Sequence, residues 1–126
     1  MIFDKTTFTV TPEILEKAQN QLTNATHGQI LNQQTGDKLT DPWVLLDEYK
    51  GTVWEDVLSS IKEPIGEARL IKLSTKQCYQ KHTDPACRYH LNLNGTDAYL
   101  IDLTELKMHP FVPDCTWYHL DTSRPH

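Results

Sequence analysis

The sequence predicts an α+β protein that is mainly β, and two observations lead to this fold class. Apolar residues recur with helical spacing in the first half of the chain, whereas they alternate with polar residues from Glu67 onward. The alternating stretches are short and are separated by turn-forming residues, which is typical of strands. We therefore expect one domain of residues 1–126, with a mostly helical and loop cover (1–66) and a β core (67–126).

The first expected helix follows Thr11. This threonine can cap a helix, and Pro12 suits the first helical position. Ile14, Ala18 and Leu22 then recur along one face, so this helix should cover an apolar surface.

A second, shorter helix is expected after a polar stretch. Residues 28–42 are rich in Gln, Asn, Thr, Gly and Asp, which predicts a loop or a loose hairpin with a turn at Asp41 and Pro42. Four apolar residues then follow the spacing i, i+3, i+4 and i+7 of one helix face: Trp54, Val57, Leu58 and Ile61. The helix should end before Pro64, because the residue that precedes a proline disfavours the helical conformation.

Short strands are expected in the second half, at residues 69–73, 77–80, 88–92, 98–103 and 116–120. The stretch 94–97, Asn-Gly-Thr-Asp, predicts a hairpin turn. Antiparallel strands behind amphipathic helices suit a jelly roll whose outer face the helices cover, which also protects the sheet from edge pairing.

Composition restricts the partners and the compartment. Twelve Lys and Arg against seventeen Asp and Glu give a formal net charge of -5, which disfavours non-specific nucleic-acid binding. Apolar runs are shorter than the roughly 20 residues that a membrane-spanning helix needs, and the amino terminus lacks the parts of a signal peptide. We expect a cytoplasmic protein without a membrane partner. The three cysteines form no Cys-X-X-Cys pair, which favours buried free thiols.

His82 and Asp84 are the first candidates for chemistry. Side chains two residues apart in an extended chain leave the same face, so this imidazole and carboxylate can share one ion. A distant histidine, either His119 or His126, would complete the two-histidine, one-carboxylate arrangement that suits iron(II) and leaves coordination positions open. A His-X-Asp pair alone also occurs by chance, as a surface histidine beside a turn-forming Asp-Pro.

The stretch that follows alternates strictly over residues 88–93. One face carries Arg88, His90 and Asn92, and the other carries Tyr89, Leu91 and Leu93. If the polar face points into a barrel, its guanidinium and imidazole need an anion or a metal-bound ligand as partner. The alternative is an ordinary sheet with Arg88 and His90 in solvent.

Three ordered motifs resemble the aspartyl/asparaginyl β-hydroxylase branch of the iron and 2-oxoglutarate oxygenases: His82-Thr83-Asp84, Arg88-Tyr89-His90-Leu91 and Asp121-Thr122-Ser123-Arg124-Pro125-His126. The resemblance covers roughly the last 60 residues and rests on motif order and spacing. It implies a cupin-like double-stranded β-helix with the N-terminal helices packed outside.

The resemblance also implies a site. Fe(II) would be bound by His82, Asp84 and His126, which leaves His119 a structural role. Arg88 and His90 would lie near the carboxylate of the cosubstrate 2-oxoglutarate. Asn92 could assist from the same face.

The family pattern continues beyond the position of His126 into a strand that carries an Arg for the distal carboxylate of 2-oxoglutarate. We expect this chain to lack that strand, and Arg88, Arg124 and Lys72 are the local cationic candidates to replace the charge. A missing strand would leave an open sheet edge, which favours a homodimer.

The expected function is therefore that of an Fe(II)/2-oxoglutarate-dependent dioxygenase that hydroxylates a small molecule or an amino-acid side chain. The main alternative is a non-catalytic or truncated cupin-like protein that binds a metal or a small anion. A zinc hydrolase also fits two His and one Asp, but the sequence places no Glu beside a ligand as an obvious base. A nucleic-acid module is disfavoured by the charge balance.

Overall fold

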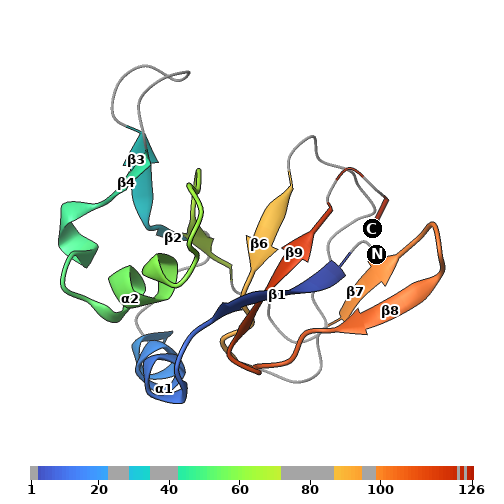
Figure 1. The fold of residues 1–126 in the computed structure, drawn as a ribbon, viewed down its shortest axis with the longest axis horizontal. Helices are drawn as coiled ribbons and strands as arrows, with labels where there is room; N and C mark the ends of the chain where they lie inside the picture. Colours follow the sequence, from blue (N-terminus) through green and yellow to red (C-terminus); the bar gives the residue numbers. More distant parts are fainter. Residues whose placement is uncertain are drawn as a thin grey trace. The chain divides into compact units, whose positions relative to one another are not determined.

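The computed structural model describes residues 3–22, 29–34, 43–71, 87–94, 99–121, 123, 125 and 126. The chain divides into two compact units, drawn in Figure 1. The helical unit is Pro12–Cys78, and the strand unit combines Met1–Thr11 with Tyr79–His126. The elements make this a mixed α+β protein that is mainly β, as the sequence predicts.

Both predicted helices are present in the helical unit, and they contact each other. α1 (Pro12–Gln21) buries Leu15 and Ala18, whereas Ile14 and Leu22 are half-buried, so its buried face is shifted from the predicted one. α2 is Val53–Ser59. It buries Val53, Trp54 and Val57, and Ile61 is buried beyond its end.

The rest of the helical unit consists of short antiparallel pairs and one 3-10 helix. β2 (Gln29–Ile30) pairs with β5 (Arg69–Leu70), and β3 (Asn32–Gln34) pairs with β4 (Trp43–Leu45). The 3-10 helix η2 is Asp47–Tyr49. Because β3 and β4 flank residues 35–42, the predicted loose hairpin is confirmed; its turn at Asp41 and Pro42 lies outside the described residues.

Asn32 ties β3 to the segment that precedes β5. Its side chain is 3% exposed, its Nδ2 donates to the carbonyl oxygen of Gly66 at 2.5 Å, and its Oδ1 accepts from the backbone N–H of Ala68 at 2.8 Å. A buried amide is tolerated when its donor and acceptor are both used. One side chain therefore satisfies two backbone groups at once.

The strand unit contains a three-stranded antiparallel sheet in the order β1-β9-β6. β1 is Phe3–Thr9, β9 is Thr116–Leu120 and β6 is Arg88–His90. β7 (Tyr99–Asp102) and β8 (Lys107–Pro110) form a separate hairpin, and Figure 1 shows β9 between β1 and β6. The central strand, near one end of the sequence, is thus paired with a strand from the other end and with β6.

The strand predictions were partly right. β9 has the predicted bounds, while β5, β6 and β7 are shorter than predicted, and residues 77–80 lie outside the described residues. Residues 95–97 of the predicted hairpin turn at 94–97 lie outside the described residues; in the described part, β6 pairs with β9 and β7 pairs with β8. β1 and β8 were not predicted, and β1 makes the first residues part of the β sheet instead of the expected cover.

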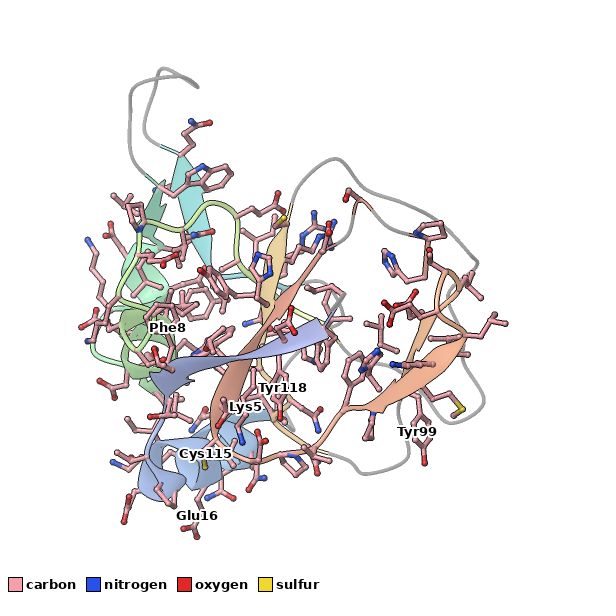
Figure 2. All side chains as sticks on the ribbon, turned by 45° about the vertical axis from the view of Figure 1, so that its right-hand side comes forward. Lys5, Phe8, Glu16, Tyr99, Cys115 and Tyr118 are labelled. Carbon is pink, nitrogen blue, oxygen red and sulfur yellow. The ribbon has the colours of Figure 1, made fainter. Side chains whose placement is uncertain are left out.

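The core of the strand unit lies between its sheet and its hairpin. Phe3, Leu100 and Leu120 form a buried cluster, and Phe111 and Tyr118 pack against it. Tyr99, next to Leu100 on β7, points away from this core (Figure 2). Of the helices in the described ranges, none is long and apolar enough to cross a membrane.

Candidate functional site

The structure describes one of the three predicted metal ligands. His82 and Asp84 lie outside the described residues, whereas His126 is described and half-buried. His126 follows Pro125, whose carbonyl oxygen accepts a hydrogen bond of 3.2 Å from the backbone N–H of Leu103. This bond ties the last residues to the turn between β7 and β8.

Arg88 and His90 share one face of the sheet, as the alternation predicts. Arg88 pairs with Leu120 and His90 with Tyr118 across the β6–β9 ladder. Arg88 is exposed and His90 is half-buried. Asn92 lies beyond the end of β6. The strand was predicted to extend to Asn92, but it ends at His90.

His90 packs among aromatic rings. Its imidazole stacks on Phe111 with ring centroids 4.4 Å apart, and it meets the ring of Phe3 edge-on at 6.0 Å. Its Nε2 atom is buried and has no hydrogen-bond partner among the residues that the structure describes. Burial lowers the pKa of His90 to about 4, so the ring is neutral near pH 7. A neutral imidazole with an unused ring nitrogen can bind a metal or exchange a hydrogen bond with a polar ligand.

A second half-buried histidine, His109 on β8, was missed from the sequence. Its ring centroid lies 6.1 Å from that of Phe3, and its Nε2 is also buried with no hydrogen-bond partner in the described part of the chain. Phe3 therefore contacts both histidines. This contact was hard to predict, because neither β1 nor β8 was predicted and only the order Leu-Lys-Met-His-Pro at 106–110 indicates a strand there.

His119 lies on the opposite face of the sheet from His90. It pairs with Tyr89 and with Asp4, and its ring meets that of Tyr89 edge-on at 5.7 Å. Neighbouring residues of a strand point to opposite faces. His119 is thus packed away from the face that carries Arg88 and His90, as a structural histidine would be.

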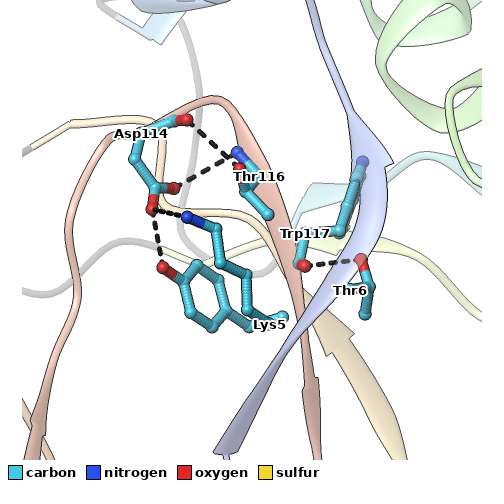
Figure 3. Close-up of polar contacts among 6 residues, drawn as sticks. Lys5, Thr6, Asp114, Thr116 and Trp117 are labelled. Atoms are coloured by element: carbon cyan, nitrogen blue, oxygen red, sulfur yellow. Dashed lines mark hydrogen bonds and ion pairs between the residues drawn. The ribbon is translucent and has the colours of Figure 1, made fainter.

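Asp114 organises the turn before β9, as Figure 3 shows. Its Oδ2 accepts a 2.6 Å hydrogen bond from the Tyr118 hydroxyl and lies 3.8 Å from Nζ of Lys5, while its Oδ1 accepts from the backbone N–H of Thr116 at 3.2 Å. Partial burial and this hydrogen bond raise the pKa of Tyr118 to about 12, so the phenol stays protonated. The Tyr118 ring stacks on Phe3 at 4.7 Å, and the Asp114 contacts therefore help to fix the aromatic surroundings of His90.

Two cysteines are described, and neither forms a disulfide. Cys115 is half-buried, but Cys87 is exposed directly before the edge strand β6, so the expectation of buried thiols was wrong for Cys87. Taken alone, the described residues contain no group of three or more His, Cys, Asp or Glu that could hold a metal ion. His82 and Asp84 are not among those residues.

The helical unit has a polar hollow of about 570 Å³ between α1, η2 and α2. Lys17, Tyr49, Trp54 and Asp56 are among its lining residues, and Nε2 of Gln29 donates to the Tyr49 hydroxyl at 2.7 Å. The predicted site residues that the structure describes, Arg88, His90, Asn92 and His126, are not among its lining residues.

No protein-family model matches this chain, and no curated protein sequence matches it. Its function is therefore inferred from its own residues and from their geometry.

Proposed function

We propose that this chain is an Fe(II)/2-oxoglutarate-dependent dioxygenase that hydroxylates a small molecule or an amino-acid side chain, built on a cupin-like double-stranded β-helix. His82, Asp84 and His126 would bind the iron, and two imidazoles with one carboxylate are a ligand set that suits iron(II). When bound, iron and 2-oxoglutarate supply the oxidising chemistry: one atom of O₂ enters the substrate and the other enters succinate, with release of CO₂.

The observation that carries this proposal is the register of β6 and β9. Arg88 and Leu120 are paired in antiparallel strands. His82 precedes Arg88 by six residues, and His126 follows Leu120 by six residues, so equal lengths of chain lead from the same end of the ladder to the two histidines. This symmetry supports a shared metal ion, and it favours His126 over His119.

Arg88 and His90 are suited to binding the cosubstrate. They share the face of the sheet that Leu120 and Tyr118 also occupy. The guanidinium can pair with a carboxylate in a bidentate manner. The neutral ring of His90 can add a hydrogen bond without placing a second charge in the apolar cluster. Together these groups would orient the cosubstrate, and the surrounding aromatic rings would exclude water.

Metal affinity tests the proposed ligands. In anaerobic calorimetric titrations with Fe(II), we expect one site per chain, and we expect His82→Ala to lower the affinity by about 100-fold or more because a direct ligand is lost. His119→Ala is the matched control and should bind iron like the unmodified chain. Equal affinities of His82→Ala and the unmodified chain would rule out this ligand set. Iron binding that 2-oxoglutarate does not strengthen would instead favour the non-catalytic metal-binding protein.

A further inference from the structure

The outer face of the β7–β8 hairpin is apolar and exposed. Tyr99 lies opposite Pro110, and Ile101 lies opposite Met108, so these four side chains share one face. The exposed fraction is 50% for Tyr99, 47% for Ile101 and 61% for Met108. Figure 2 shows the Tyr99 side chain projecting outward from the hairpin.

On the inner face of the same hairpin, the residues from β7 are buried. Leu100 is 8% exposed and belongs to the cluster with Phe3, and Asp102 is fully buried. An antiparallel strand with one solvated face normally alternates between apolar and polar residues. In the hairpin, apolar residues occupy both faces of β7, a pattern typical of a strand that is covered on both sides.

Leu106, at the tip of the hairpin, adds a second observation. It is 82% exposed and has a backbone φ of 55°. This left-handed conformation favours glycine or asparagine and is sterically unfavourable for leucine. An exposed leucine side chain at such a position buries little apolar surface within the strand unit. Its presence there therefore suggests a contact with another molecule.

The charges of the hairpin cancel on its exposed surface. Between Tyr99 and Pro110, all of which the structure describes, the acidic and basic residues are Asp102, Glu105 and Lys107. Asp102 is buried, and Lys107 lies 3.7 Å from Glu105 in an ion pair. The face is therefore neutral although the whole chain carries -5. In a two-fold interface a surface meets its own copy, so a neutral patch can pair with itself without repulsion.

We propose that two copies of this chain associate through this β7–β8 outer face, defined by Tyr99, Ile101, Leu106, Met108 and Pro110. The two hairpins would pack face to face, with sheets about 10 Å apart. Such a patch spans on the order of 300–600 Å², below the roughly 800 Å² that each partner buries in a standard interface, so the dimer is weak. This inference is independent of the proposed catalysis, and it places the expected dimer contact on a sheet face instead of a sheet edge.

Sedimentation velocity from about 1 μM to about 1 mM tests the association, since weak dimers dissociate within this range. The unmodified chain should move from its monomer mass of 14.5 kDa toward twice that value. Ile101→Glu should remain monomeric throughout. The matched control is Ile30→Glu in the helical unit, because Ile30 is 49% exposed, close to the value for Ile101, and this variant should still dimerise.

Leu106→Asn provides a variant that should keep its fold, because asparagine tolerates the left-handed backbone better than leucine does. It should weaken dimerisation at least several-fold while its circular dichroism spectrum stays unchanged. The proposal is overturned if the unmodified chain is monomeric at all concentrations, or if Ile101→Glu and Leu106→Asn dimerise normally. Co-sedimentation of a monomer with neutral or anionic lipid vesicles, lost in Ile101→Glu, would overturn it in favour of a membrane-contact surface.

Discussion

At the scale of single residues, the surroundings of the His90 side chain determine its protonation state. It is a titratable ring held between Phe111 and Phe3, where burial disfavours its charged form. The sequence placed His90 correctly on the same face as Arg88, because strand alternation is a local property. It gave no indication of Phe3, which reaches His90 only through the pairing of β1 with β9.

His90 should make stability depend on pH. The pKa of His90 in the folded chain is about 4, below the ordinary value of 6.5, because burial disfavours the charged ring. The contribution of the neutral ring to folding stability is therefore fully present above pH 6.5 and is lost as the pH falls from 6.5 toward 4. The loss amounts to about 3 kcal/mol in the free energy of unfolding. Urea denaturation at pH 7 and pH 4.5 should show a clearly smaller loss for His90→Phe, which keeps an aromatic ring. An identical loss in both proteins would show that His90 is not responsible.

Asn32 makes a prediction that concerns the helical unit. Asn32→Ala leaves the carbonyl group of Gly66 and the N–H group of Ala68 without their partner. We expect a destabilisation of about 1–3 kcal/mol. Gln33→Ala, at the exposed neighbouring position, should change the stability by less than about 0.5 kcal/mol. Chemical denaturation that gives similar values for the two variants would contradict the role assigned to Asn32.

At the scale of elements, α2, which a local sequence pattern defines, was predicted, and β1, which depends on a distant partner, was missed. α2 was predicted because its spacing of apolar residues, from Trp54 to Ile61, is a property of eight consecutive positions. β1 was missed because its apolar residues stand at Phe3 and Phe8 with polar residues between them, and its partner is β9 at the other end of the chain. The partner that the structure shows for β6 is likewise distant, since β9 lies more than 20 residues further along the chain.

The hairpin tip gives a test at this scale. Leu106→Asn should raise the stability of the monomer by about 1 kcal/mol, because a left-handed backbone costs a leucine more than an asparagine. The measurement is urea denaturation at a protein concentration low enough to exclude association. Glu105→Asn is the neighbouring control and should not stabilise the monomer. A loss of stability in Leu106→Asn would mean that the leucine side chain packs within its own chain.

At the scale of the whole molecule, the strand unit joins the two ends of the sequence. The register of β6 and β9 pairs Arg88 with Leu120, and in the sequence His82 precedes Arg88 by six residues while His126 follows Leu120 by six. Motif order in the sequence suggested His82, Asp84 and His126 as ligands, and of these the structure describes His126. The pairing of Arg88 with Leu120 joins positions far apart in the sequence, so no short window of sequence contains it.

Metal binding and dimerisation should be separable. Ile101→Glu, which is designed to block association, should bind Fe(II) with the affinity of the unmodified chain, because Ile101 is not one of the proposed ligands. His82→Ala should still dimerise. Calorimetry and sedimentation on both variants measure the two properties independently. Loss of both properties in either variant would show that the site and the β7–β8 outer face depend on each other.

The central claim is that Fe(II) and 2-oxoglutarate bind together at one site. The most direct measurement is an anaerobic titration of the protein with both, followed by the visible charge-transfer absorbance that a chelated cosubstrate produces, with His82→Ala as control. We predict a band that appears only when both are present and that is absent in His82→Ala. Bound iron without the band, or a band that persists in His82→Ala, would contradict the proposed site.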